Sequence, residues 1–132
     1  MSTLDRPQPK PRPVYLNLVA IRLPLPGIVS ILHRVSGAAL FLFAIPLVLW
    51  AVQASLASPE SFAALQAAFA HPLAKLLTIG LVWAYLHHFC AGIRYLLLDL
   101  HRGIELEPAR RSSVIVLVVS IALTLIVGVR LW

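Results

Sequence analysis

Three apolar stretches separated by short polar segments constrain this chain more than any other feature. They run over residues 30–54, 72–100 and 112–132, and 60% of the 132 residues are hydrophobic. Soluble domains are about 45–50% apolar, and a helix needs roughly 20 residues to cross the hydrocarbon core of a bilayer. Because backbone groups in lipid must be hydrogen-bonded within their own segment, the sequence predicts an all-α membrane protein with three transmembrane helices. Pro46 is expected to bend the first helix without ending it.

Lysine and arginine residues gather on the segments 1–29 and 101–111. They are Arg6, Lys10, Arg12, Arg22, Arg102, Arg110 and Arg111, whereas the segment 55–71 has none. The positive-inside rule therefore predicts a cytoplasmic N-terminus and 101–111 loop, with the 55–71 loop and the C-terminus in the periplasm. Since topology explains the net charge of +6, nucleic-acid binding is not expected.

The segments outside the spans give further local signals. Residues 6–13 alternate proline with polar or basic residues, which favours an extended backbone, either free or lying along a partner. Residues 15–26 are expected to run along the membrane surface. Ser58 followed by Pro59 is typical of a helix start, so a short amphipathic helix over 62–69 is predicted in the outer loop.

A polar cluster opens the first span. The spacings between Ser30, His33 and Arg34 place all three on one face of a helix. A polar group that enters lipid is costly unless something holds it. A hydroxyl, an imidazole and a fixed positive charge at the membrane edge suit an anionic or carbonyl-bearing ligand. The alternative for Arg34 is a guanidinium that simply reaches out to the headgroups.

The second span carries two adjacent histidines, His87 and His88. They diverge by about 100° on a helix, so only one can face a given ligand. His88 shares its face with Gly92, whose missing side chain leaves room for a flat macrocycle. A histidine near mid-membrane serves in proton transfer, metal binding or haem ligation, or bonds as a neutral group to a neighbouring helix. His87 is expected to be structural, and Arg94 and Asp99 are expected to mark the membrane edge and to bond locally.

Haem ligation by His88 gives roles to the polar residues of the first span. Guanidinium groups pair well with carboxylates, so His33 and Arg34 suit the haem propionates at the cytoplasmic side. The Ser30 hydroxyl suits a quinone carbonyl. A b-type haem usually takes two axial histidines, and this chain offers one good candidate. The second ligand is therefore expected from another chain.

Two motifs give the chain a family resemblance. They are Ser30-Ile31-Leu32-His33-Arg34-Val35-Ser36-Gly37 and His88-x-x-x-Gly92-Ile93-Arg94, the latter followed by Asp99. With an Arg12-Pro13 opening before them, the chain resembles the cytochrome b membrane-anchor subunit of proteobacterial succinate dehydrogenase from about residue 12 to its end. One position departs from the pattern, because Tyr95 stands where some relatives have histidine.

The resemblance implies specific roles and partners. His88 corresponds to an axial ligand of haem b, with the other ligand supplied by a second membrane-anchor subunit. Ser30, Ile31 and Arg34 correspond to ubiquinone-site residues, and His33 and Arg34 to groups near the haem propionates. A flavoprotein with FAD and an iron–sulfur subunit would deliver electrons from succinate at the bacterial inner membrane. The chain is then a subunit of an enzyme and is not catalytic alone.

The residues also fit two other functions. One is the anchor of a fumarate reductase, in which the same architecture works in reverse. The other is a haem-free structural or assembly subunit that uses His33, Arg34 and His88 for hydrogen bonds between helices. A proton-coupled transporter is disfavoured, since the sequence shows no inverted repeat and few intramembrane acids.

Overall fold

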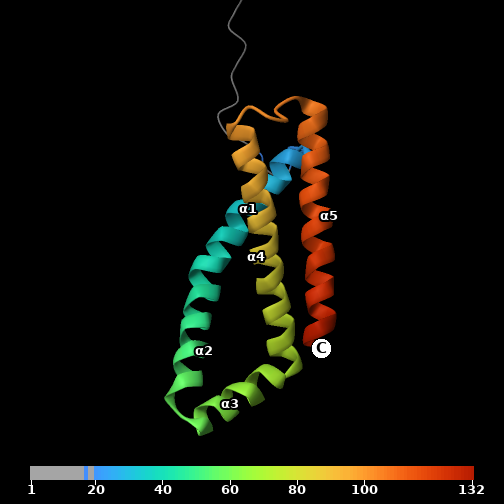
Figure 1. Ribbon diagram of the computed structural model, residues 1–132. Helices are drawn as coiled ribbons and strands as arrows, with labels where there is room; N and C mark the ends of the chain where they lie inside the picture. Colours follow the sequence, from blue (N-terminus) through green and yellow to red (C-terminus); the bar gives the residue numbers. More distant parts are fainter. Residues whose placement is uncertain (1–16, 18–19) are drawn as a thin grey trace, which may run out of the picture.

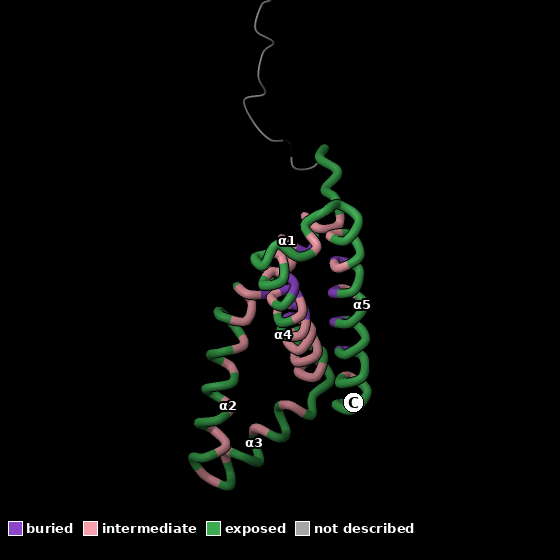
Figure 2. Tube along the Cα trace, turned by 45° about the horizontal axis from the view of Figure 1, so that its top comes forward, coloured by how far each residue is buried: buried purple, intermediate pink, exposed green. Residues whose placement is uncertain are grey.

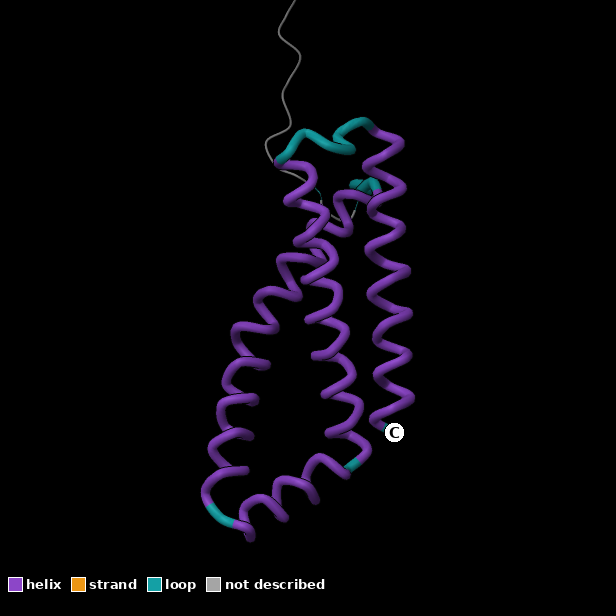
Figure 3. The backbone as a smooth tube through the Cα atoms, in the orientation of Figure 1, coloured by secondary structure: helices purple, strands orange, loops and turns teal. Residues whose placement is uncertain are grey.

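The computed structural model describes Asn17 and residues 20–132, and its regular structure is entirely helical over that part of the chain (Figures 1 and 3). The predicted extended segment 6–13 lies outside the described residues, as do residues 15, 16, 18 and 19 of the segment 15–26. The expectation of an all-α protein is confirmed for the described part.

The first long helix is a continuous run from Leu25 to Ala57. It consists of α1 (Leu25–Ala39), the π-helical turn η2 (Leu40–Ala44) and α2 (Ile45–Ala57). The helix begins earlier than the apolar stretch because Pro24, in an extended conformation, forms its N-cap and Pro26 occupies its first turn. Proline suits these positions, where no intrahelical donor is needed.

Pro46 changes the course of this helix without interrupting it. Proline has no N–H to donate to the carbonyl four residues earlier. The turn before it is widened, and the Ile45 N–H bonds to the Leu40 carbonyl in the π register. Figure 1 shows the chain changing direction between α1 and α2 and continuing as a helix. The predicted bend at Pro46 is thus confirmed.

The outer loop folds into α3 (Pro59–Ala70), which connects the far ends of α2 and α4 (Figure 1). The predicted start is confirmed, although the helix is longer than the predicted range 62–69. Ser58 is the N-cap, and its hydroxyl accepts from the Ser61 N–H at 3.2 Å. The Ser61 hydroxyl accepts in turn from the Ser58 N–H at 3.1 Å, which completes a reciprocal cap.

The other two long helices are α4 (Pro72–Asp99) and α5 (Leu106–Leu131). Between them, His101 (φ +57°) and Gly103 (φ +76°) adopt left-handed conformations that reverse the chain. The α5 helix begins before the apolar stretch 112–132. The polar side chains in its first turns are exposed, and an exposed polar side chain does not prevent helix formation. At the opposite end of the bundle, Lys75 Nζ donates to the Trp132 carbonyl at 3.1 Å and ties α4 to α5.

The core is small and lies where α1, α4 and α5 meet (Figure 2). Its buried apolar members are Val29, Ala84, Ala91 and Val116. Large apolar side chains cover the outward faces of all three long helices. By contrast, α2 diverges from α4, and the backbones of these two helices do not approach each other closely in the described structure. The arrangement suits a bundle surrounded by lipid rather than by water.

The three long helices are long and apolar enough to cross a membrane. They cover Leu25–Ala57, Pro72–Asp99 and Leu106–Leu131. Successive long helices run in opposite directions, so the N-terminal side of α1 and the α4–α5 connection lie at the same end of the bundle (Figure 1). The sequence prediction of three potential spans is therefore confirmed.

Replacing Ser58 by alanine is expected to loosen α3 without affecting the long helices. Loss of an N-cap hydroxyl costs about 1 kcal/mol, so amide exchange in the first turn of α3 should accelerate about fivefold. Hydrogen exchange followed by mass spectrometry measures this change. Ser55→Ala is the matched control, because the Ser55 hydroxyl bonds only to the Val52 carbonyl in α2. Equal protection of α3 in both variants would contradict the capping role.

Candidate functional site

His88 lies between α1 and α4 with its two ring nitrogens in different surroundings. Its Nδ1 is 3.0 Å from the backbone carbonyl oxygen of His33. Because a carbonyl can only accept, Nδ1 carries the proton and donates it, which leaves a lone pair on Nε2. No described residue hydrogen-bonds to Nε2. An imidazole whose Nδ1–H is held by a carbonyl is the usual arrangement of a histidine that ligates a metal through Nε2.

Ser36 completes this holding contact. It is 2% exposed, and its hydroxyl donates to the same His33 carbonyl at 2.9 Å. Its Oγ also lies 3.3 Å from Nδ1 of His88. Ser36 thus fixes the imidazole from the α1 side. The sequence analysis missed this role, and the only available signal was its position three residues after His33.

Gly37 is the glycine that admits the His88 ring. A Cβ atom at this position would lie 2.7 Å from Cε1 of His88, which is closer than van der Waals contact allows. The sequence analysis gave Gly92 a different part, the room for a flat macrocycle, and that part stays a prediction. At Gly92 a Cβ atom would meet only Nε2 of His33, at 4.0 Å. The close approach is therefore made on α1, and His33 borders the space beside Gly92.

His33 joins the residues that the sequence placed on one face of α4. Its ring stacks on His88 with a centroid separation of 4.1 Å and an interplanar angle of 13°. It also contacts Tyr95 at 5.0 Å in a tilted arrangement. His88 and Tyr95 thus flank His33, with Gly92 beside it. Asp99, which shares their helical face by spacing, is exposed and lies nearer the end of the helix.

The polar cluster of the first span divides into two parts. His33 turns toward α4, whereas Arg34 and Ser30 lie at the edge of the interface and bond to each other. Arg34 Nη2 donates to Ser30 Oγ at 3.0 Å, as their spacing allows. Ile31, on the same turn, is 44% exposed. The part of the chain seen in the structure supplies no carboxylate to Arg34.

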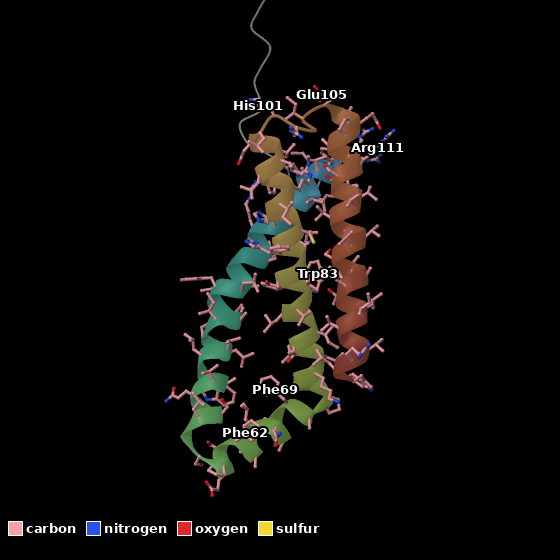
Figure 4. All side chains as sticks on the ribbon, in the orientation of Figure 1. Phe62, Phe69, Trp83, His101, Glu105 and Arg111 are labelled. Carbon is pink, nitrogen blue, oxygen red and sulfur yellow. The ribbon has the colours of Figure 1, made fainter. Side chains whose placement is uncertain are left out.

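His87 and Arg94 are buried on the other sides of α4. His87 is fully enclosed, and its ring stacks on that of Trp83 with a centroid separation of 5.3 Å. Figure 4 shows Trp83 about midway along α4. The Val29 backbone is a polar neighbour of its ring, but neither ring nitrogen reaches hydrogen-bond geometry with a described group. The structural role expected for His87 stays a prediction.

Arg94 corrects an expectation. It does not bond locally at the membrane edge, because it is only 6% exposed and its Nε donates to Ser112 Oγ on α5 at 3.0 Å. A fixed charge on the face of α4 that meets α5 must find acceptors there.

The described residues contain no group of three or more histidine, cysteine, aspartate or glutamate side chains placed to hold a metal ion. His88 therefore offers a single ligand position.

The helices and the histidine site together define a multi-pass helical membrane subunit, and comparison with known proteins gives its family. Residues 8–127 match the succinate dehydrogenase/fumarate reductase transmembrane subunit family, and the chain belongs to it. It is therefore a membrane subunit of a succinate dehydrogenase complex, as the sequence predicted.

Three relatives illustrate this similarity. The succinate dehydrogenase cytochrome b556 subunit of Paracoccus denitrificans is 38% identical over 115 residues, which cover 87% of this chain and 88% of the relative. The subunit of the same name from Coxiella burnetii is 38% identical over 92% of this chain and 97% of its own length. That of Rickettsia felis is 32% identical over 89% of this chain and 91% of its own length.

Replacing Gly37 by alanine is expected to destabilise the contact between α1 and α4. The added Cβ forces the His88 ring away from the His33 carbonyl, and overpacking of this kind costs about 1–3 kcal/mol. The measurement is the thermal unfolding midpoint of the purified complex. Gly80→Ala is the control, since a Cβ there meets nothing within 4 Å. A Gly37→Ala complex as stable as the Gly80→Ala complex would show that the His88 ring is not held as described.

Proposed function

We propose that this chain is the haem-binding and quinone-binding membrane anchor of succinate dehydrogenase, with His88 as an axial ligand of haem b. The single observation that carries the proposal is the state of the His88 ring. Its Nδ1–H is held by the His33 carbonyl, and its Nε2 has no partner among the described residues. The names of the Paracoccus and Coxiella relatives, both cytochrome b556 subunits, support a haem in the same type of chain.

The residues around His88 fit a haem b. His88 would hold the iron through Nε2, while His33 and Arg34, on the same turn of α1, would receive the propionates. When bound, the haem supplies one-electron redox chemistry. His71 and His101 lie at opposite ends of α4, so neither suits the second axial position. That ligand would come from a second membrane-anchor subunit.

Ser30, Ile31 and Arg34 would form this chain's part of the ubiquinone site. Because Ser30 Oγ accepts from Arg34, its own proton remains free to donate to a quinone oxygen. The Arg34 charge stabilises negative charge that develops on the quinone as it is reduced. Ile31 offers an exposed apolar side chain for the ring. The polar pair thus orients the quinone, and the redox chemistry belongs to the cofactors.

The end of the bundle that carries Arg34 and the 100–105 connection would face the cytoplasm by the positive-inside rule, with the C-terminus in the periplasm. An iron–sulfur subunit would dock at this end beside a flavoprotein with FAD, so that electrons from succinate reach the quinone near Ser30. The three relatives compared above are succinate dehydrogenase subunits, which favours this direction over fumarate reduction.

Replacing His88 by alanine is expected to remove the haem absorbance of the complex. The measurement is the reduced-minus-oxidised spectrum of the purified complex, normalised to its flavin content so that assembly is scored separately. His71→Ala and His101→Ala are controls, because both histidines are exposed and lie at the ends of α4. A complex with His88→Ala that keeps the wild-type spectrum would overturn the ligand assignment and favour a haem-free structural subunit.

Replacing Ser30 or Arg34 by alanine is expected to slow ubiquinone reduction at least about tenfold, because a preorganised donor to the developing charge is lost. Succinate oxidation with an artificial electron acceptor should keep its wild-type rate. Both rates are measured on the same preparation. Ser55→Ala and Arg130→Ala serve as controls, since these residues lie far from the polar cluster. Full quinone reduction in both test variants would rule out the proposed site.

A further inference from the structure

A groove lies between α4 and α5, on a different side of α4 from the His88 site. Its volume is about 640 Å³, and it reaches the connection between the two helices. Apolar side chains form most of its wall, among them Ile93, Leu97 and Ile115. Three arginines complete the lining: Arg94, Arg102 and Arg111. Figure 4 shows Arg111 on α5 at the end of the bundle that also carries His101 and Glu105.

The buried arginine of this groove has unused hydrogen-bonding capacity. Arg94 is more than nine-tenths buried, and it donates through Nε to Ser112 Oγ and through Nη2 to the Ala109 carbonyl. Its Nη1 has no hydrogen-bond partner among the described residues, and these residues do not bury it completely. This edge of the guanidinium is therefore not fully enclosed, and Arg94 is among the residues that line the groove.

The arginines that line the groove form no ion pair with any described residue. Arg102 and Arg111 are exposed and form no ion pair with a described residue. The only salt bridge among the described residues joins Arg110 to Glu107. Asp99 and Glu105, the acidic residues nearest the α4–α5 connection in sequence, do not line the groove. Three guanidinium groups thus border one apolar surface.

The combination selects one kind of ligand. Guanidinium groups bind phosphate oxygens in a bidentate manner. An acidic peptide would satisfy the arginines but leave the apolar wall uncovered, and an apolar helix would leave the arginines unpaired. A phospholipid carries its anionic phosphate next to its acyl chains, which matches the order of groups along this groove. Basic pockets between transmembrane helices on the cytoplasmic side typically take anionic lipid headgroups.

We propose that this groove binds an anionic phospholipid from the leaflet at the 100–105 end of the bundle. The phosphate lies between Arg102 and Arg111 and takes a further hydrogen bond from Arg94. One acyl chain lies along Leu97 and Ile115. The bound lipid ties α4 to α5 at one end of the bundle. The hydrogen bond from Lys75 to the Trp132 carbonyl connects the same two helices at the opposite end.

The test uses the purified complex with the full chain, stripped of lipid in detergent. Native mass spectrometry measures its affinity for phosphatidylglycerol and for phosphatidylcholine with the same acyl chains. We expect tighter binding of phosphatidylglycerol, reduced about fivefold for each arginine removed in the double variant Arg102→Gln/Arg111→Gln. The charge-matched control is Arg110→Gln/Arg130→Gln, because neither of these arginines lines the groove. This control should bind like the wild type.

A second variant tests the apolar half of the groove. Leu97→Trp adds bulk without changing charge and should also reduce phosphatidylglycerol binding. Equal affinity for the two lipids would overturn the proposal, as would an equal loss of binding in the charge-matched control. Full binding by Leu97→Trp would exclude the acyl-chain position. If inorganic phosphate alone raised the thermal unfolding midpoint as much as phosphatidylglycerol, the site would be one for a soluble anion, and the lipid assignment would fail.

Discussion

The hydrogen bond from His88 Nδ1 to the His33 carbonyl is the contact on which the arrangement of the site depends. It fixes the tautomer of the imidazole and the direction of Nε2, while Ser36 supports the same carbonyl from α1. It also sets the distance between α1 and α4, because the ring occupies the space that a side chain at Gly37 would need. A single contact thus joins helix packing to the chemistry that the imidazole can perform.

Polar contacts connect the helices of this bundle. Apolar surfaces gain little by leaving lipid, so close packing and interhelical hydrogen bonds must supply the association of membrane helices. Here the bond between Arg94 and Ser112 and the bond from Lys75 to Trp132 connect α4 to α5 near its two ends. The buried face of α5 carries small hydroxyl residues such as Ser120, which allow the helices to approach closely.

The central helix α4 serves two neighbours with different residues. His88 faces α1, whereas Arg94 faces α5 and contributes to the arginine groove. Adjacent positions on a helix diverge by about 100°, which is why His87 is enclosed in the core while the His88 ring keeps Nε2 free. The division separates the proposed redox site from the proposed lipid site on the two sides of one helix.

The sequence by itself determined the three long helices, the bend at Pro46 and the cap at Ser58, because each depends on local backbone chemistry and on the length of an apolar run. It did not place the start of α5, since an apolar run marks contact with lipid and not the end of a helix. Only the tertiary structure decided that Gly37 makes the close approach and that Arg94 reaches α5. Helical periodicity places residues on a face, but the neighbour that this face meets is set by packing between helices distant in sequence.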